Sequence, residues 1–384
     1  MNSIISGYRR ENGKLGVRNY VLLLPVDAVS YSICKSVENN VYGTIAIYHP
    51  YGRMQFGEDL ELHSRTIIGT GKNPNVAAVI VIGIEQTVTE NIANQIAESG
   101  KPVESFWSDG NGDFKTIERA SRTAQKFVQH ATSLKRTEAD ISELIIGYKC
   151  GESDTTSGLA GNPVAGVISD ILIEKGSTII FGETPELTGA EHILEKRFSD
   201  SELANKFLNM HREYLELIES KGVDLLGSQP TIGNMKGGIT TIEEKAMGNI
   251  QKIGNTSITG VLDTAEEPIF KGLHFMNSSS AAADIVTAMM ASGATLNLFV
   301  TGRGNNLGNP ICPVVKLCAN PNACESIPEN IDVDISDLLT YDSTLNAAAD
   351  KTLNYIKKVS EGMLTSAETL NHNEYAITRL FPQS

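Results

Sequence analysis

Two kinds of hydrophobic pattern alternate along this chain. Short continuous apolar runs are typical of strands buried on both faces, and apolar residues three or four positions apart are typical of amphipathic helices. The pattern predicts strands at Tyr20–Val26, Gly43–Ile47, Val76–Ile82, Val103–Trp107, Glu143–Tyr148, Thr178–Phe181, Leu296–Val300 and Val314–Leu317. It predicts helices at Thr89–Glu98, Thr116–Ser133, Val164–Lys175, Glu186–Phe198, Ser201–Glu219, Thr241–Ile253, Ala281–Ala291 and Leu345–Glu361.

Alternating strands and helices indicate parallel sheets that are covered by helices on both faces. The polar, charged segment Leu134–Asp140 separates two such series. We therefore expect an α/β protein with two α/β domains, residues 1–138 and 139–384. The segment Gly222–Gly238 is long and polar, and loops of that length inside a domain are often functional.

Composition narrows the class of protein. The 384 residues are 41% hydrophobic and 20% charged, with a formal net charge of −14, which is ordinary for a folded globular chain and unfavourable for binding nucleic acid. The longest apolar run, Val76–Ile82, is too short to span a bilayer, and the N-terminus lacks the apolar core of a signal peptide. Five cysteines are too few for a disulfide framework. We expect a cytoplasmic protein that binds neither membrane nor nucleic acid.

Candidate chemistry gathers in polar, glycine-containing segments that follow predicted strands, where the ligand crevice of a parallel sheet lies. The first segment, residues 149–158, places Cys150, Ser153, Asp154 and Thr155 in one turn before a helix. Helix N-termini attract anions, so Ser153 and Thr155 are candidate substrate-binding residues and Asp154 is a candidate catalytic residue. The simpler alternative is an ordinary capped loop, with Cys150 as a packing thiol.

The second segment, residues 181–192, contains Glu183, Glu186 and His192. Carboxylates and an imidazole suit a divalent metal of the iron, manganese or zinc type. Alternatively, Glu186 interacts with the helix dipole and His192 is an ordinary helix residue.

The third segment, residues 236–245, offers Lys236, Thr241, Glu244 and Lys245. Lys245 is a candidate general base if it is desolvated, and Glu244 a second candidate catalytic residue. An exposed charged helix face is the alternative.

Four further candidates for substrate binding follow other strand-like runs: His49, Arg53, Thr301 and Arg303. A guanidinium such as that of Arg303 can clamp a carboxylate or sulfonate through two hydrogen bonds. A structural role is an equal alternative for both segments that carry these residues, 49–55 and 300–306. No metalloprotease, Walker A or GxSxG motif occurs. The glycine spacing GxGxxxG around Arg303 is only a weak signal for dinucleotide binding, because no acidic residue follows it at a suitable distance.

Five ordered motifs together resemble the altronate/galactarate dehydratase family: GYRRENGKLGVRN, KCGESDTTSGLAGNP, FGETPELTGAEH, KGGITTIEEKAMG and VTGRGNNLGNP. Residues 49–85 resemble most the sulfo-lyase branch, because Arg53, Met54 and Glu85 stand where many sugar-acid dehydratases carry cysteine-containing forms. The resemblance implies that residues 1–138 form a dimerisation domain and residues 139–384 an unusual Rossmann-like catalytic domain.

The resemblance also implies dependence on Fe²⁺, which another divalent cation can replace, and a separate small SAF-like (alpha) subunit. The implied activity is metal-assisted β-elimination from a small anionic 2-hydroxy acid, with sulfolactate giving pyruvate and sulfite. We assign the metal to Cys150, Glu183 and Glu186 as our own inference from the residues. Lys245 or His192 is then the base.

In this interpretation the anionic groups are bound by Arg303, Lys236 and the backbone near Ser153–Thr155. His49 and Arg53 line the entrance or contact the small subunit. Two alternatives remain open within the resemblance: a sugar-acid dehydratase large subunit, and a non-catalytic anion-binding subunit. A dinucleotide-dependent oxidoreductase is a third, which the weak fingerprint disfavours.

Overall fold

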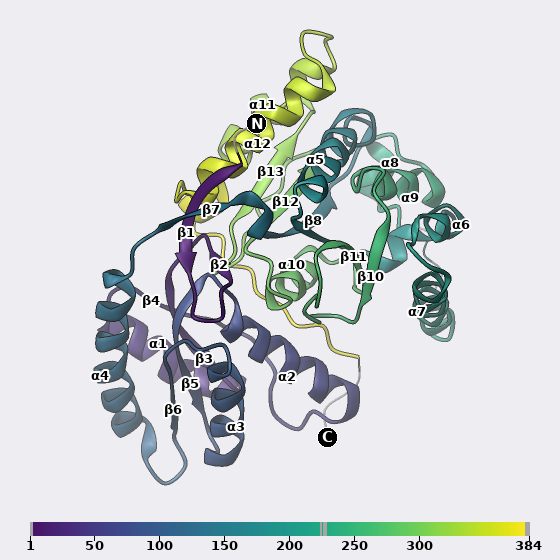
Figure 1. The fold of residues 1–384 in the computed structure, drawn as a ribbon. Helices are drawn as coiled ribbons and strands as arrows, with labels where there is room; N and C mark the ends of the chain where they lie inside the picture. The colour runs from purple at the N-terminus through teal and green to yellow at the C-terminus, as the bar shows by residue number, and fades with distance from the viewer. Residues whose placement is uncertain (1–2, 223–224, 226–228, 381–384) are drawn as a thin grey trace.

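The computed structural model describes residues 3–222, 225 and 229–380 and contains three sheets. A four-stranded parallel sheet has the order β4-β3-β5-β6, and a seven-stranded parallel sheet has the order β10-β11-β9-β8-β12-β13-β14. A three-stranded antiparallel sheet, β2-β1-β7, lies where the two halves of the chain meet (Figure 1). The α/β class with helix-flanked parallel sheets is therefore confirmed.

The first half builds the small sheet and the four-stranded sheet. Its strands are β1 (Ile4–Arg9), β2 (Leu15–Gly16), β3 (Tyr20–Pro25), β4 (Thr44–Ala46), β5 (Val76–Gly83), β6 (Val103–Trp107) and β7 (Thr137–Asp140). Its helices are α1 (Tyr31–Asn40), α2 (Gly57–Lys72), α3 (Gln86–Ala97) and α4 (Gly112–Ser133). Every residue of β5 is buried, as its continuous apolar run predicts.

The second half builds the seven-stranded sheet. Its strands are β8 (Ile145–Gly151), β9 (Thr178–Phe181), β10 (Ile258–Leu262), β11 (Gly272–Met276), β12 (Leu296–Thr301), β13 (Val314–Cys318) and β14 (Val333–Asp334). Its helices are α5 (Asn162–Glu174), α6 (Glu191–Leu194), α7 (Ser201–Glu219), α8 (Ile232–Lys236), α9 (Ile242–Gln251), α10 (Ala282–Ala291), α11 (Pro321–Ser326), α12 (Leu345–Ser360) and α13 (Ser366–Thr369).

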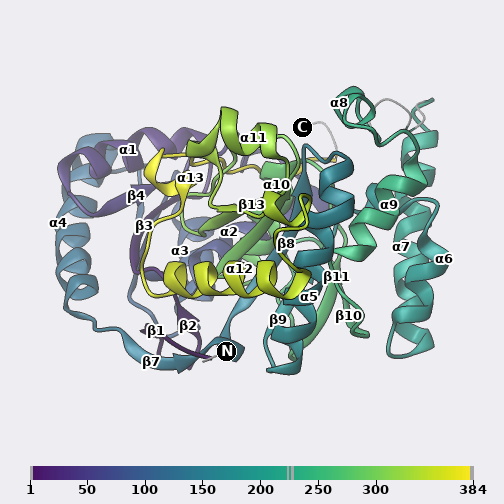
Figure 2. The same ribbon diagram turned by 90° about the horizontal axis from the view of Figure 1, so that it is seen from above.

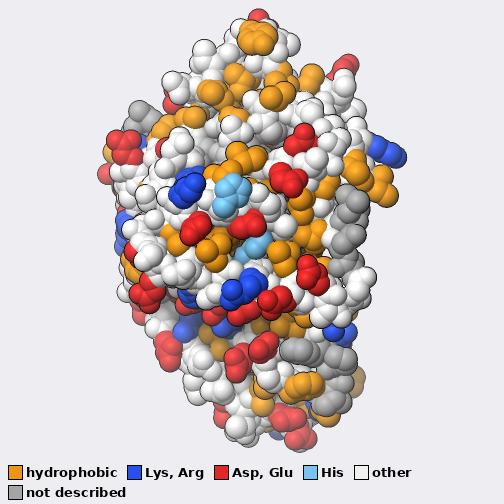
Figure 3. All heavy atoms as spheres, turned by 90° about the vertical axis from the view of Figure 1, so that its right-hand side faces the viewer, with side chains coloured by type: hydrophobic (Ala, Val, Ile, Leu, Met, Phe, Trp, Pro, Cys, Tyr) orange, Lys and Arg blue, Asp and Glu red, His pale blue; other side chains and the backbone are white. Residues whose placement is uncertain are grey.

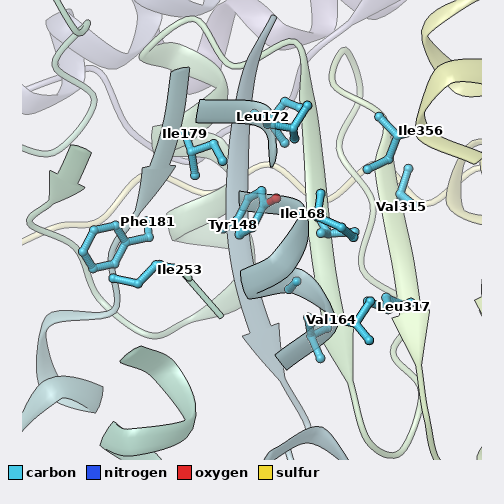
Figure 4. Packing of buried hydrophobic residues seen from close by; sticks show 14 of the residues in the cluster. Tyr148, Val164, Ile168, Leu172, Ile179, Phe181, Ile253, Val315, Leu317 and Ile356 are labelled. Atoms are coloured by element: carbon cyan, nitrogen blue, oxygen red, sulfur yellow. The ribbon is translucent and has the colours of Figure 1, made fainter. Parts of the chain in front are cut away.

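Helices cover the seven-stranded sheet on both faces (Figures 1 and 2). Val164, Ile168 and Leu172 lie four residues apart on α5 and pack against the sheet beside Tyr148 and Val315 (Figure 4). This spacing places all three side chains on one helix face, so α5 buries a continuous apolar stripe.

The predicted boundary segment is not a simple linker, because its last residues form β7, which pairs with β1 in antiparallel register. The N-terminal strand is thereby joined to the start of the second half. The two halves also meet where α2 packs against α10, and Arg65 donates a hydrogen bond of 2.9 Å to the Thr264 carbonyl. The proposed division at residues 138 and 139 falls inside β7 and stays a prediction.

Two local predictions were wrong. The predicted helix Glu186–Phe198 is instead a 3₁₀ turn, Thr184–Leu187, followed by the short α6 and a second 3₁₀ turn, Glu195–Arg197. Gly189, whose φ is +88°, interrupts it. The predicted loop Gly222–Gly238 contains α8, while part of that segment lies outside the described residues.

The described helices include none with both the length and the apolar character required to cross a lipid bilayer. One face of the molecule, seen in Figure 3, carries acidic, basic and hydrophobic side chains interspersed, without a large area of one charge sign.

Candidate functional site

Three metal-ligand candidates meet at the carboxyl end of the seven-stranded sheet. Cys150 lies near the end of β8, Glu183 follows β9, and Glu186 lies in the adjacent 3₁₀ turn. Each side chain offers one ligand atom, and these atoms lie within 4.8 Å of one another. The sheet order changes direction at β8, because β9 lies on one side of β8 and β12 on the other. Ligands bind at such switch points, so topology and chemistry indicate the same place.

The backbone at Glu183 is in the left-handed region, with φ of 70°. A non-glycine residue in that conformation is uncommon, and such residues concentrate at functional sites. The Ser278 hydroxyl accepts a hydrogen bond of 2.9 Å from the Glu183 amide, and the Thr184 amide donates one of 3.1 Å to the Ser278 carbonyl. These contacts hold the carboxylate of Glu183 at the base of the site.

Three buried lysines surround these acids, and two of them were not predicted. Lys149 and Lys252 both form ion pairs with Glu183. Lys245, a predicted site residue, lies 3.3 Å from Glu186 through its Nζ. Lys149 stands out in the sequence as a lysine in a strand that is otherwise mainly apolar. Lys252 lies seven residues after Lys245, a spacing that places both on one face of α9.

The ion pairs decide the protonation of these groups. Burial alone would lower the pKa of Lys149, but the charges of Glu183 and Glu186 raise it above its ordinary value. For Lys252, burial again acts downward, while Cys150 and Glu183 raise the pKa overall. Burial acts upward on the pKa of Glu183, which both lysines nevertheless hold below its ordinary value. Lys149 and Lys252 are therefore ammonium ions facing a carboxylate.

Cys150 is fully enclosed, and its Sγ lies 3.8 Å from Glu183 Oε2. Burial, followed by the negative charge of Glu183, raises the pKa of the thiol above its ordinary value, and Lys252 opposes this effect. Within the protein itself Cys150 is therefore a neutral thiol. Binding of a cation would favour the thiolate, since metal ligation requires the deprotonated sulfur.

Donor chemistry and spacing both bear on whether a metal ion fits here. One sulfur and two carboxylate groups suit a borderline transition-metal ion. Glu186 Oε2 is buried and has no hydrogen-bond partner, which leaves it available as a ligand atom. The oxygens of Glu183 already contact two lysines, so those contacts compete with a cation. Cys150, Glu183 and Glu186 therefore fit a metal ion, with Glu183 the most contested of the three ligands.

A cavity of about 230 Å³ opens beside this cluster, between the turn after β8 and the N-terminal part of α9. It is lined by Cys150, Ser153, Asp154, Thr155, Ser157, Gly158, Leu159, Asn162, Gly238, Ile239, Glu244, Lys245 and Gly248. Six of these residues were predicted from the sequence as site residues. The cavity suits a small anion, because a buried lysine and several hydroxyl groups face one limited volume.

Asp154 is placed in the wall of this cavity but is fully engaged in hydrogen bonds. Its Oδ1 accepts from the Ser157 amide at 3.0 Å and from the Thr156 hydroxyl at 2.6 Å. Its Oδ2 accepts from the side chain of Asn320 at 2.8 Å. This geometry fixes the turn after β8, so Asp154 holds the site in shape. A carboxylate bound in this way is poorly suited to accept a proton from substrate.

Ser153 and Thr155, the candidate substrate-binding residues of that turn, both line the cavity. Ser153 is buried, and its hydroxyl has no hydrogen-bond partner. Thr155 is tied through its amide to the Gly237 carbonyl at 3.0 Å. Glu244, by contrast, accepts hydrogen bonds from the Thr240 and Thr241 amides at the start of α9. That capping role explains why its carboxylate is exposed at the edge of the cavity.

Several predicted residues are not among those that line the cavity. His192 is exposed on α6, because the predicted helix breaks at Gly189 and turns it to the surface. Thr241 caps α9 and lines a different cavity beside α7. Lys236 is exposed at the end of α8.

The end of β12 contributes Thr301 and Arg303. Thr301 is fully buried, and its hydroxyl has no hydrogen-bond partner. Arg303 is exposed and lies against the start of α8, since a Cβ atom added at Gly233 would be 2.9 Å from its Nη1. Arg303 therefore lies at the periphery of the cavity.

His49 and Arg53 lie in the loop that follows β4 of the four-stranded sheet and do not line this cavity. The His49 ring is fully buried, and its Nε2 lies 2.8 Å from the Pro25 carbonyl. Arg53 pairs with Glu85 at 3.8 Å near the carboxyl ends of β3 and β5. Both residues follow a strand, which is why the sequence grouped them with the site. That strand, however, belongs to another sheet.

Comparisons with known proteins identify the family of the chain. Residues 141–383 match the family model described as D-galactarate/Altronate dehydratase, C-terminal, and residues 7–132 match D-galactarate dehydratase/Altronate hydrolase, second domain. The chain is 52% identical over 377 residues to (2R)-sulfolactate sulfo-lyase subunit beta of Chromohalobacter salexigens, covering 98% of this chain and 97% of that protein. It is 30% identical over 392 residues to altronate dehydratase of Bacillus subtilis, covering 98% and 78%. Galactarate dehydratase (L-threo-forming) of Escherichia coli is 30% identical over 311 residues, 78% of this chain and 59% of that enzyme.

Proposed function

Because the chain belongs to the D-galactarate/altronate dehydratase family, we propose that it is the large subunit of a lyase that removes sulfite from sulfolactate and leaves pyruvate. The relative named sulfolactate sulfo-lyase subunit beta matches over nearly its full length at 52% identity, which is the observation that carries this proposal. The buried lysines and carboxylates beside a small cavity support it, because the substrate is a compact dianion.

Elimination from sulfolactate needs a base and a means of stabilising negative charge. The base removes the proton on C2, and the C–H electron pair forms the C2–C3 double bond. The C3–S bond breaks, and its electron pair leaves with sulfite. The remaining enol of pyruvate then takes a proton on C3 and loses the proton of its hydroxyl group, which gives pyruvate. Charge develops on the carboxylate during this step, so cationic and donor groups that face it lower the barrier.

Lys245 is the residue we assign as the base. It lines the cavity, and its Nζ is held by Glu186 at 3.3 Å and by Asn234 at 3.0 Å. The raised pKa values of Lys149 and Lys252 keep those two lysines protonated. Their role is electrostatic: they fix Glu183 and add positive charge near the substrate carboxylate and sulfonate. Ser153 and Thr155 supply hydroxyl groups to the same anion.

Fe²⁺ is the cofactor that we propose, held by Cys150, Glu183 and Glu186, and another divalent cation of similar preference is able to replace it. Bound there, the ion would act as a Lewis acid for negative charge on substrate oxygen. Support comes from the three ligand atoms within 4.8 Å of one another and from the partnerless oxygen of Glu186.

The relative's name, subunit beta, supports a second chain in the active enzyme. We propose a small SAF-like (alpha) subunit as that partner and a homodimer of the large subunit as the assembly. A cytoplasmic location fits the five cysteines, all of which are free.

Elimination of water from a sugar acid is the second candidate activity, because the altronate and galactarate dehydratases are relatives at 29–30% identity. An anaerobic assay with Fe²⁺ and the small subunit separates the two activities. Equimolar sulfite and pyruvate from sulfolactate would support the sulfo-lyase. Keto-acid from altronate or galactarate, without sulfite, would assign the dehydratase. No product from any of the three acids would favour a non-catalytic subunit.

A further inference from the structure

Asn162 carries a buried amide that the protein leaves without a partner. It is the first residue of α5, follows the π-helical turn Ser157–Gly161, and is 2% exposed. Its Oδ1 has no hydrogen-bond partner, and among the described residues none donates to or accepts from either end of the amide. Buried polar groups are normally satisfied, so an unsatisfied one needs an explanation. Its place in the wall of the cavity provides one.

Asp154 and Lys245, which also line the cavity, already have hydrogen-bond partners. Asp154 accepts four hydrogen bonds, three from side chains and one from a backbone amide. Lys245 is held by Glu186 and Asn234. Asn162 is instead positioned by packing alone: a Cβ atom added at Gly248 would lie 3.2 Å from its Nδ2. Because no hydrogen bond ties either end, rotation about the Cβ–Cγ bond can present the carbonyl or the amino group to the cavity.

We propose that Asn162 binds the C2 hydroxyl of the substrate and makes the cavity selective for 2-hydroxy acids; this rests on the proposed function. The lysine and the hydroxyl groups that line the cavity can donate to the acceptor oxygens of carboxylate and sulfonate, and the carboxylates of Asp154 and Glu244 are already engaged in hydrogen bonds of their own. A hydroxyl is the one donor that a 2-hydroxy dianion carries. The Asn162 carbonyl is a buried neutral acceptor without a partner, which such a hydroxyl requires.

Comparing two ligands on two proteins tests this pairing. The assembled enzyme with Fe²⁺ is assayed for kcat and KM with sulfolactate and for the inhibition constant of 3-sulfopropanoate, which lacks only the C2 hydroxyl. The same measurements are made on Asn162→Ala. We expect the preference of the wild type for the hydroxylated ligand to fall about tenfold in the variant, the amount that one hydrogen bond to a neutral group contributes. Affinity for 3-sulfopropanoate should change little.

Asn255→Ala, which removes an amide on the loop after α9, is the matched control and should leave both constants unchanged. Equal weakening of both ligands, or an unchanged preference, would overturn the proposal. If Asn162→Ala does not fold, Asn162→Ser, which shortens the side chain at a helix start, gives the same comparison.

If the wild type does not act on sulfolactate, the proposed function fails by itself. The pairing is then tested with altronate and its 2-deoxy analogue, where the same loss of preference in the variant is expected. An unchanged preference there would reject the role of Asn162 whichever acid is the substrate.

Discussion

The ammonium group of Lys252 lies 3.4 Å from the sulfur of Cys150, so a buried cation from the C-cap of α9 faces a buried thiol from β8. The same ammonium also pairs with Glu183. Strand and helix ends far apart in the sequence are joined through this contact, and the lysine supplies positive charge where a metal ion would also bind. The balance between lysine and metal is therefore the central electrostatic property of the site.

Replacing Lys252 by methionine should destabilise the fold. The change removes a buried cation and leaves the buried Glu183 with one lysine partner instead of two. Breaking a buried ion pair from one side costs about 3–5 kcal/mol, and the remaining Lys149 should keep the loss near the lower end. Urea unfolding measures the change. Arg122→Met, at an exposed pair with Glu118, is the control and should change the free energy of unfolding by less than about 0.5 kcal/mol. A loss for Lys252→Met no larger than the control would contradict the buried pair.

Cys150→Ser should weaken binding of iron. The thiol is the one soft ligand atom of the group, and changes even to residues behind metal ligands weaken binding about 10–100-fold. We expect at least a tenfold loss of affinity after anaerobic reconstitution, measured as iron per chain at a series of free Fe²⁺ concentrations. Cys34→Ser, at a buried cysteine of the other sheet, serves as the control. Iron stoichiometry and affinity equal to those of the wild type would remove Cys150 from the metal site.

Lys245→Met should lower kcat about 10²–10⁴-fold, the usual contribution of a general base. His192→Gln should leave kcat within about twofold, because His192 is exposed on α6 and does not line the cavity. Both variants are assayed for sulfite release from sulfolactate, after thermal unfolding has shown that they fold. A large loss in His192→Gln with an active Lys245→Met would reverse the assignment of the base.

Acid should destabilise the first half through His63. Burial, and then the neighbouring His49, lowers the pKa of His63 to about 3, and its Nε2 has no partner. Because the folded-state pKa lies below the unfolded value of about 6.5, the contribution of the neutral ring is complete above pH 6.5. It is lost as the pH falls from 6.5 toward 3, by up to about 1.4 kcal/mol per pH unit.

Urea unfolding between pH 7 and pH 4 tests this contribution. His63→Phe should have a shallower dependence on pH than the wild type, because phenylalanine does not titrate. His130→Phe, on the exposed face of α4, is the matched control and should keep the wild-type slope. Equal slopes for wild type and His63→Phe would show that His63 is protonated as easily in the folded as in the unfolded protein.

Much of the fold could be predicted from local pattern. Val76–Ile82 was predicted as a buried strand and Thr178–Phe181 as a strand, and they form all but the last residue of β5 and the whole of β9. The strands β10 and β11 were missed, since Ile258–Leu262 is short and contains a glycine and Gly272–Met276 begins with one. Short segments of that kind gain their conformation from neighbouring strands and carry a weak signal of their own.

The sequence predicted which kinds of side chain gather at the candidate site, but only some of the residues that the structure brings together there. Cys150, Glu183 and Lys245 were recognisable because thiol, carboxylate and lysine stood in polar segments at strand or helix ends. His49 was grouped with them on the same grounds, although its strand belongs to the other sheet. The rule that ligands bind at strand ends holds within one sheet, and the sequence does not state which strands share a sheet.

The sequence by itself determined the alternation of strands and helices, the polar turns after them and the acids and thiol that those turns present. Only the tertiary structure decided that Lys149 and Lys252 enclose Glu183, and that Asn162 is left unpaired in a cavity wall. The physical reason is that periodicity and capping act over one or two helical turns. Burial of a charge depends on segments a hundred or more residues apart in the chain, such as those that carry Cys150 and Lys252, which the tertiary fold brings together.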